Sequence, residues 1–487
     1  MKKNIKAVIA CAGVLVLAGG GYAALMLTDN APDTSSVSSS DEPIATTPSK
    51  ILGYAKYDVL SISVKNNNGE YVCVSTSEKD DEGMPVFTIE GIEDLDINRT
   101  LIDSLTNSVS ALGCDDVVEE NAADLEKYGL ANPQAEVSIK ATADAKTLLI
   151  GNESPTSGET YCMIRGEKTV YLAATSSLAV FLNTKENFLS TALIEASSDG
   201  NNPVPEIITI DRKDLDYDIV LEYDDNTTES GNTSGTLATH YMSEPVFSYL
   251  DVQKSQNATQ GFFGLNAYSA LYAHPDKTQL EASGLSDPFC TVSMTTMEGD
   301  SHTIKIGNKL NVAEGEYYSV MLDDIDVIYA VSAENLCWAT LTPGDITSKM
   351  IFGTFVWDIS KLEINVNGGE SVLFTGSGTS ADDYELTKNG EKADAVRFQK
   401  FYQYLLKTSA EDFVIDEQPQ GEPTVSIELE TQDGTVNQTV EFYKADGKKS
   451  LIVVDGTPCF KCRTAYVDLL IENLAKFDTN EEFVMNW

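Results

Sequence analysis

The chain has 487 residues and a formal charge of −43, from 33 Lys and Arg against 76 Asp and Glu. A surface this acidic repels phosphate backbones and anionic lipid headgroups, which excludes nucleic-acid binding and a peripheral polybasic membrane role. A hydrophobic content of 42% is that of a globular protein and excludes wholesale disorder. At roughly 100–200 residues per domain, the length predicts about three domains.

Residues 1–28 predict three cytoplasmic lysines followed by a transmembrane anchor. Ala7 to Leu27 is a run of 21 residues without a charge, which as a helix would be about 30 Å long and would match the bilayer core. Because the lysines precede the run and acid dominates after it, we expect a single-pass cell-membrane protein with a cytoplasmic N-terminus and its bulk extracytoplasmic. Signal-peptidase cleavage at Gly21-Tyr22-Ala23 and lipidation of Cys11 in a lipobox-like sequence remain alternatives.

Residues 29–49 predict a tether between this anchor and the globular part. Ser, Thr or Pro fill 11 of the 20 positions from 29 to 48, and almost nothing there can be buried. A flexible chain of this length reaches roughly 25 Å. We therefore expect the tether to space the globular part from the membrane.

The rest of the chain contains an internal repeat. Leu125 to Pro133 (LEKYGLANP) recurs as Leu280 to Pro288 (LEASGLSDP). Three later stretches recur in the same order: Leu149-Ile-Gly-Asn152 with Lys305-Ile-Gly-Asn308, Gly158-Glu-Thr-Tyr161 with Gly315-Glu-Tyr-Tyr318, and Leu189-Ser-Thr-Ala-Leu-Ile194 with Ile346-Thr-Ser-Lys-Met-Ile351. A divergent third copy is visible at its front end, where Asp358 matches Asp58, and it lacks the Gly-Leu element. The repeat predicts domains at residues 50–195, 196–352 and 353–487.

The hydrophobic residues of the copies recur with two spacings, one typical of strands and one typical of helices. Val137 and Ile139 alternate with polar residues, which predicts a strand with one buried face. The segments from Leu101 to Leu112 and from Val396 to Leu405 have helical spacing. The predicted fold class is therefore α+β, with three tandem repeats of antiparallel sheet, each packed with one or two helices, after a single transmembrane helix.

The repeated Gly-Leu element predicts a helix stop. If a helix ends at Tyr128, Gly129 takes the left-handed position and Leu130 folds back on Leu125, as in the Schellman motif. Pro133 then prevents the helix from resuming. We interpret the element as structural.

These elements together resemble a known family. A helix ending in Tyr-Gly-Leu, an Ile-Gly-Asn turn, a Gly-Glu-x-Tyr hairpin and the Val170-Tyr171 strand are similar to the bacterial domain-of-unknown-function family DUF4340. The resemblance covers nearly everything after residue 50, and the third copy departs from it at the helix stop. It implies an envelope protein associated with ABC-2-type or gliding-associated transporters, and it supplies no catalytic residues.

The expected function follows from the anchor, the repeats and this resemblance. We expect a non-catalytic, membrane-anchored extracytoplasmic module that binds protein partners, with an ABC transporter permease subunit as the partner that the resemblance implies. A cell-surface protein that binds a glycan or a solute is the alternative, since tyrosines can stack on sugars. A flat apolar patch would favour the first function, and a concave aromatic cleft would favour the second.

The sequence offers no catalytic set. His240, His274 and His302 are the only histidines, and none recurs at a matching position in another copy. No nucleophile elbow, phosphate-binding loop, zinc-protease helix or EF-hand loop is present. We therefore expect no enzymatic activity, no catalytic, cofactor-binding or metal residues, and no cofactor.

Cys459 and Cys462 form the closest cysteine pair. Structural thiols, a local disulfide, and a metal or redox role are all open for this pair. A zinc site needs four ligands, and the sequence supplies no second pair nearby.

Overall fold

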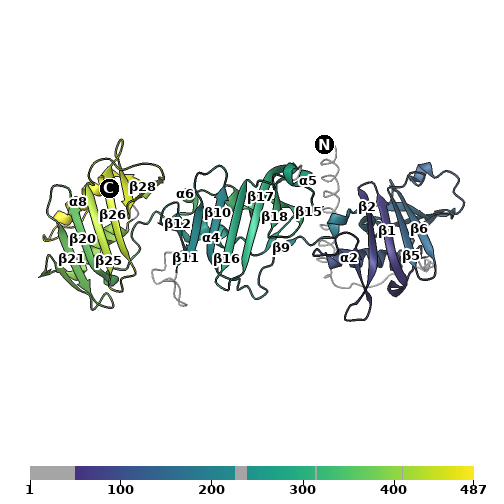
Figure 1. The fold of residues 1–487 in the computed structure, drawn as a ribbon, viewed down its shortest axis with the longest axis horizontal. Helices are drawn as coiled ribbons and strands as arrows, with labels where there is room; N and C mark the ends of the chain where they lie inside the picture. Colours follow the sequence, from purple (N-terminus) through teal and green to yellow (C-terminus); the bar gives the residue numbers. More distant parts are fainter. Residues whose placement is uncertain (1–49, 225–237, 313–314, 408–409) are drawn as a thin grey trace, which may run out of the picture. The chain divides into compact units, whose positions relative to one another are not determined.

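The computed structural model describes residues 50–224, 238–312, 315–407 and 410–487 (Figure 1). These residues form four antiparallel sheets of eight, nine, two and nine strands.

The first large sheet has the spatial order β3-β2-β1-β5-β6-β7-β8-β4. Its strands are β1 (Val59–Asn66), β2 (Gly69–Lys79), β3 (Pro85–Ile89), β4 (Asp116–Glu119), β5 (Ala135–Ala141), β6 (Ala145–Glu153), β7 (Glu159–Ile164) and β8 (Val170–Ala174). Its helical segments are η1 (Lys56–Asp58), α2 (Arg99–Ala111), η2 (Glu126–Tyr128), α3 (Thr175–Ala179), η3 (Val180–Leu182) and η4 (Lys185–Phe188). Helix α2 is N-capped by Asn98, whose side chain accepts a hydrogen bond from the N–H of Leu101.

The second large sheet has the order β13-β12-β11-β10-β16-β17-β18-β19-β15. Its strands are β10 (Pro205–Arg212), β11 (Ile219–Tyr223), β12 (His240–Glu244), β13 (Ser248–Tyr249), β15 (Ser269–Ala273), β16 (Cys290–Thr296), β17 (Ser301–Val312), β18 (Gly315–Leu322) and β19 (Val327–Ser332). Its helical segments are α4 (Val252–Gln260), α5 (Lys277–Ala282), η5 (Ala333–Asn335), η6 (Cys337–Ala339) and α6 (Pro343–Ile346). Strands β9 (Ala192–Ile194) and β14 (Leu265–Asn266) form the two-stranded sheet.

The third large sheet has the order β23-β22-β21-β20-β25-β26-β27-β28-β24. Its strands are β20 (Ile359–Val366), β21 (Val372–Ser377), β22 (Glu385–Lys388), β23 (Glu391–Lys392), β24 (Ala410–Phe413), β25 (Val425–Thr431), β26 (Asn437–Lys444), β27 (Lys449–Val454) and β28 (Thr457–Arg463). Its helical segments are η7 (Val356–Asp358), α7 (Ala395–Leu406) and α8 (Thr464–Ala475).

The three large sheets repeat one strand order. With β1, β10 and β20 taken as equivalent, the order of the first sheet recurs in the second and third, and β13 and β23 are additional edge strands. The predicted tandem repeat is therefore confirmed. Each large sheet takes its strands from one of the three predicted segments, whose boundaries as separate domains stay a prediction.

One face of each large sheet packs on helical segments. In the third sheet the inward Val425, Ile427 and Leu429 are fully buried, while the Ser426 and Glu428 side chains between them remain partly exposed. Phe374 on this inward face lies 4.9 Å from the ring of Phe398 in α7. The alternation predicted from the sequence is thus present, and the opposite face of the sheet carries polar side chains.

The predicted α+β class is wrong. Strands account for 42% of the chain and helices for 20%, and four sheets are present where three were predicted. Edge strands such as β13 and β23 have two residues each, too few to show a period in the sequence. Helices such as η2 and η6 are single turns of three residues, so the sheets dominate.

The predicted single-pass anchor and membrane localisation are not supported. No helix within the described ranges is long and apolar enough to cross a membrane. The longest of them, α2, has 13 residues and spans about 20 Å, against about 30 Å of bilayer core. Ala7 to Leu27 and the predicted tether lie outside the described residues.

Candidate functional site

The repeated Gly-Leu element ends a helical turn as predicted. Gly129 has a φ of +71°, and its N–H donates to Glu126 O at 3.0 Å. The N–H of Leu130 donates to Leu125 O at 3.0 Å. These are the two hydrogen bonds of the Schellman motif.

The second copy repeats this geometry, and the third copy omits it. Gly284 has a φ of +70°, and its N–H donates to Glu281 O at 3.1 Å. The N–H of Leu285 donates to Leu280 O at 2.9 Å. In the third copy no helix lies between β24 and β25, as the missing Gly-Leu element predicts.

The Ile-Gly-Asn turn packs directly against these glycines. A Cβ on Gly129 would lie 2.4 Å from Asn152 Oδ1, and one on Gly284 would lie 2.6 Å from Asn308 Oδ1. Asn308 also donates its backbone N–H to Ser283 O at 2.8 Å and its side-chain Nδ2 to Ala282 O at 2.9 Å. The two motif parts are therefore one packing unit, a connection that their separation in the sequence conceals.

The Gly-Glu-x-Tyr hairpin completes the same unit in the first copy. The ring of Tyr161 lies 4.9 Å from that of Tyr128, and the Tyr128 hydroxyl donates to Glu119 Oε2 at 2.8 Å. Tyr128, Leu130, Leu149, Met163 and Val170 form a buried apolar cluster, with Tyr161 packed against it. The residues that carry the family resemblance thus serve packing.

The three histidines lie in the second repeat, and each has its own local contacts. His240 is 2% exposed, and its Nε2 lies 2.7 Å from Pro205 O, which fixes Nε2 as a donor because a carbonyl oxygen can only accept. Its Nδ1 lies 2.9 Å from Thr239 Oγ1. Burial lowers the pKa of His240 below its usual value. His274 Nδ1 lies 3.1 Å from Asp326 Oδ2, and His302 pairs across strands with Met294.

The cysteine pair is buried and reduced. Cys459 and Cys462 are free thiols, so the local disulfide is not formed. Burial raises the pKa of both thiols to about 12, which leaves almost no thiolate at neutral pH. Among the residues that the structure describes, no group of three His, Cys, Asp or Glu side chains could hold a metal ion.

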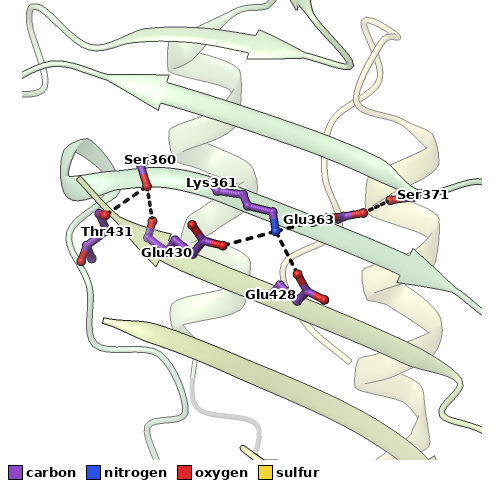
Figure 2. A network of polar contacts seen from close by, with 7 residues as sticks. All are labelled: Ser360, Lys361, Glu363, Ser371, Glu428, Glu430 and Thr431. Atoms are coloured by element: carbon purple, nitrogen blue, oxygen red, sulfur yellow. Dashed lines mark hydrogen bonds and ion pairs between the residues drawn. The ribbon is translucent and has the colours of Figure 1, made fainter. Parts of the chain in front are cut away.

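A charged network lies on the polar face of the third sheet (Figure 2). Lys361 Nζ lies 2.9 Å from Glu428, 3.3 Å from Glu430 and 3.4 Å from Glu363. The hydrogen bond to Glu428, followed by that to Glu430, raises the pKa of Lys361. The Ser371 hydroxyl donates to Glu363 at 2.8 Å, and this bond, with Lys361, lowers the pKa of Glu363. The network places one ammonium among three carboxylates and joins β20 to β25.

An aromatic patch lies on the corresponding face of the second sheet. Cross-strand pairs connect Ile207 to Glu222, Glu222 to Tyr241 and Tyr241 to Tyr249, so these side chains share one face. Phe247 joins them, with its ring 5.5 Å from Tyr241 and 5.3 Å from Tyr249. We define the aromatic patch as Ile207, Tyr241, Phe247 and Tyr249.

The aromatic patch is exposed at two of its four residues and has an acidic setting. Ile207 and Phe247 are each 39% exposed, while Tyr241 and Tyr249 are half-buried and burial raises the pKa of Tyr249 to about 12. Strands β11, β12 and β13 contain Glu222 and Glu244 but no Lys or Arg. The Tyr241 hydroxyl donates to Glu222 Oε2 at 3.0 Å. The sequence missed this patch because its residues come from separate strands and meet only through the sheet register.

Comparison with known proteins identifies the family alone. A family model described as a domain of unknown function (DUF4340) matches residues 88–243 and 264–427. No curated protein and no solved structure matches the chain. The first matched region crosses the predicted boundary near residue 195, and the second crosses the predicted boundary near residue 352. Because they cover more than half of the chain, the protein belongs to the DUF4340 family and carries it in tandem.

Proposed function

We propose that this protein is a non-catalytic module that binds a protein partner through the aromatic patch. The cluster on the face of the second sheet, with Ile207 and Phe247 exposed, carries this proposal. Contiguous exposed aromatic and aliphatic side chains are characteristic of protein-binding surfaces. A sheet face suits a protein surface better than a sugar or solute, which binds in a concave site.

The packing role of the family-motif residues supports a non-catalytic function. Gly129, Leu130 and Tyr161 are used for a helix stop and an apolar cluster. The buried thiols of Cys459 and Cys462 have pKa values raised to about 12, which makes them poor nucleophiles. Binding therefore accounts for the described surface with fewer assumptions than catalysis.

The charge of the patch defines the chemistry of the partner. Glu222 and Glu244 lie on the strands of the patch, and the whole chain has 76 acidic residues against 33 basic ones. A complementary partner presents apolar side chains bordered by Lys or Arg, which steer the encounter and can lie over the exposed ring of Phe247. The family resemblance makes a subunit of an ABC transporter the partner that we propose.

Photo-crosslinking in living cells tests the proposal. A photo-reactive amino acid replaces Phe247 in one variant and Val117 in a control, since Val117 is 41% exposed in β4 and lies outside the patch. We expect position 247 to form a covalent adduct with a basic segment of a transporter subunit, and position 117 to form none. Absence of a protein adduct specific to position 247 would contradict the proposed function.

A further inference from the structure

The last five residues, Phe483 to Trp487, lie on helices α7 and α8 of the third repeat. The indole of Trp487 meets the rings of Tyr404 at 5.7 Å and Tyr466 at 5.0 Å, edge to face. Phe483 lies 5.9 Å from the ring of Phe401. Two aromatic side chains four positions apart thus anchor the segment on rings that belong to the core.

A buried amide holds the backbone between the two anchors. Asn473 in α8 has no exposed surface. Its Nδ2 donates to Val484 O at 2.8 Å, and its Oδ1 accepts the N–H of Val484 at 2.8 Å. One side chain therefore satisfies both backbone polar groups of Val484, as a neighbouring strand would. Without the segment, this buried amide would lose both bonds, which is costly.

Two basic side chains flank the segment in this acidic chain. Arg397 Nη2 donates to Glu481 O at 2.8 Å, and its guanidinium lies 4.3 Å from the ring centre of Phe483. Lys407 Nζ donates to Met485 O at 2.5 Å. Residues 481–487 form no helix or strand, so these side chains supply the contacts that regular structure would supply elsewhere.

The geometry points to a peptide-binding site on α7 and α8, which the chain's own C-terminal segment fills in cis. Aromatic anchors, a buried backbone clamp and flanking charge are the parts of a peptide-recognition groove. We propose that the site also takes a partner's extended segment with Phe and Trp four positions apart after acidic residues. The cis segment then competes at the high effective concentration of an intramolecular ligand, so the partner gains access as that segment leaves.

Binding in trans tests the site on the full 487-residue chain. The receptor carries Phe483→Ser and Trp487→Ser, which empties the site, and the probe is the fluorescent peptide Glu-Glu-Phe-Val-Met-Asn-Trp. We expect saturable binding, no binding of the same peptide with Ser in place of Phe and Trp, and on the order of tenfold or more weaker binding when Asn473→Ala is added. No binding to a receptor with a cooperative thermal transition would overturn the proposal, and so would equal binding by the Asn473→Ala receptor.

Hydrogen exchange of the unaltered chain gives a test that depends on no variant. The N–H of Val484 is held only by Asn473 Oδ1 among the contacts of the described residues. We expect it to exchange through local opening, orders of magnitude faster than amides of β25 and without dependence on dilute denaturant. Exchange of Val484 only through global unfolding would mean that the site never opens to a partner, and would overturn the proposal.

Discussion

Gly129 and Gly284 allow the two parts of the repeated motif to pack closely. A side chain at either position would collide with Asn152 or Asn308 of the Ile-Gly-Asn turn. At Gly129 the backbone is left-handed, and the space that a Cβ would need is filled by Asn152. Gly91 is a matched control, since its φ is +80° but nothing lies within 4 Å of a Cβ. Comparison of Gly129 with Gly91 therefore separates the free-energy cost of left-handed strain from the cost of displacing Asn152.

We predict that Gly129→Ala destabilises the first repeat more than Gly91→Ala does. Left-handed strain alone costs about 1 kcal/mol in the control, and displacement of Asn152 brings the cost at Gly129 to about 2–4 kcal/mol. Urea unfolding of the two variants measures both costs. Equal losses would show that Asn152 moves aside freely and that the motif is no packing unit.

Burial of His240 makes the second repeat sensitive to acid. Its folded pKa is lowered by burial from the ordinary value of 6.5, so the unfolded chain takes up the proton first as the pH falls. We predict that the free energy of unfolding declines below about pH 6.5 and that His240→Gln removes this part of the slope. His302→Gln is the control. An unchanged slope in the His240→Gln protein, followed by denaturant unfolding between pH 7 and pH 5, would refute the assignment.

At the scale of elements, Lys361 stabilises the ladder between β20 and β25. It neutralises one of three carboxylates that lie within 3.4 Å of its amino group. We predict that Lys361→Met costs about 1 kcal/mol at pH 7 and that the loss shrinks as the pH falls toward the carboxylate range, where repulsion among the glutamates disappears. Lys448→Met, at an exposed position, should change neither value. A pH-independent loss would assign the effect to packing of the lysine stem.

Local features of the sequence predicted local structure. The left-handed Gly129, the fold-back of Leu130 and the strand alternation around Val137 depend on neighbours within a few residues, and the structure confirms them. The balance of helix and sheet was not predictable in this way, because edge strands such as β13 owe their existence to pairing with distant partners. The aromatic patch was hidden for the same reason, since only the β10–β11–β12–β13 register brings Ile207 and Tyr241 onto one face.

At the scale of the whole molecule, the charge of −43 governs association. Acidic surfaces attract a basic partner over a distance set by the Debye length, about 10 Å at 0.1 M salt. We predict that the association rate with the partner crosslinked at position 247 falls steeply between 50 mM and 500 mM salt, while the dissociation rate changes little. Surface plasmon resonance at several salt concentrations measures both rates. A rate of association that does not depend on salt would contradict a basic partner.

The most direct test of binding through the aromatic patch is the equilibrium affinity of patch variants for the partner crosslinked at position 247. Phe247→Ser and Tyr241→Ser remove the exposed ring and its neighbour, and Val117→Ser removes a similarly exposed aliphatic side chain from β4. Isothermal titration calorimetry with the purified partner should show an affinity at least about tenfold weaker for each patch variant and an unchanged affinity for Val117→Ser, as expected for a central aromatic contact. Affinities that are the same for all three variants and the unaltered chain would contradict the account.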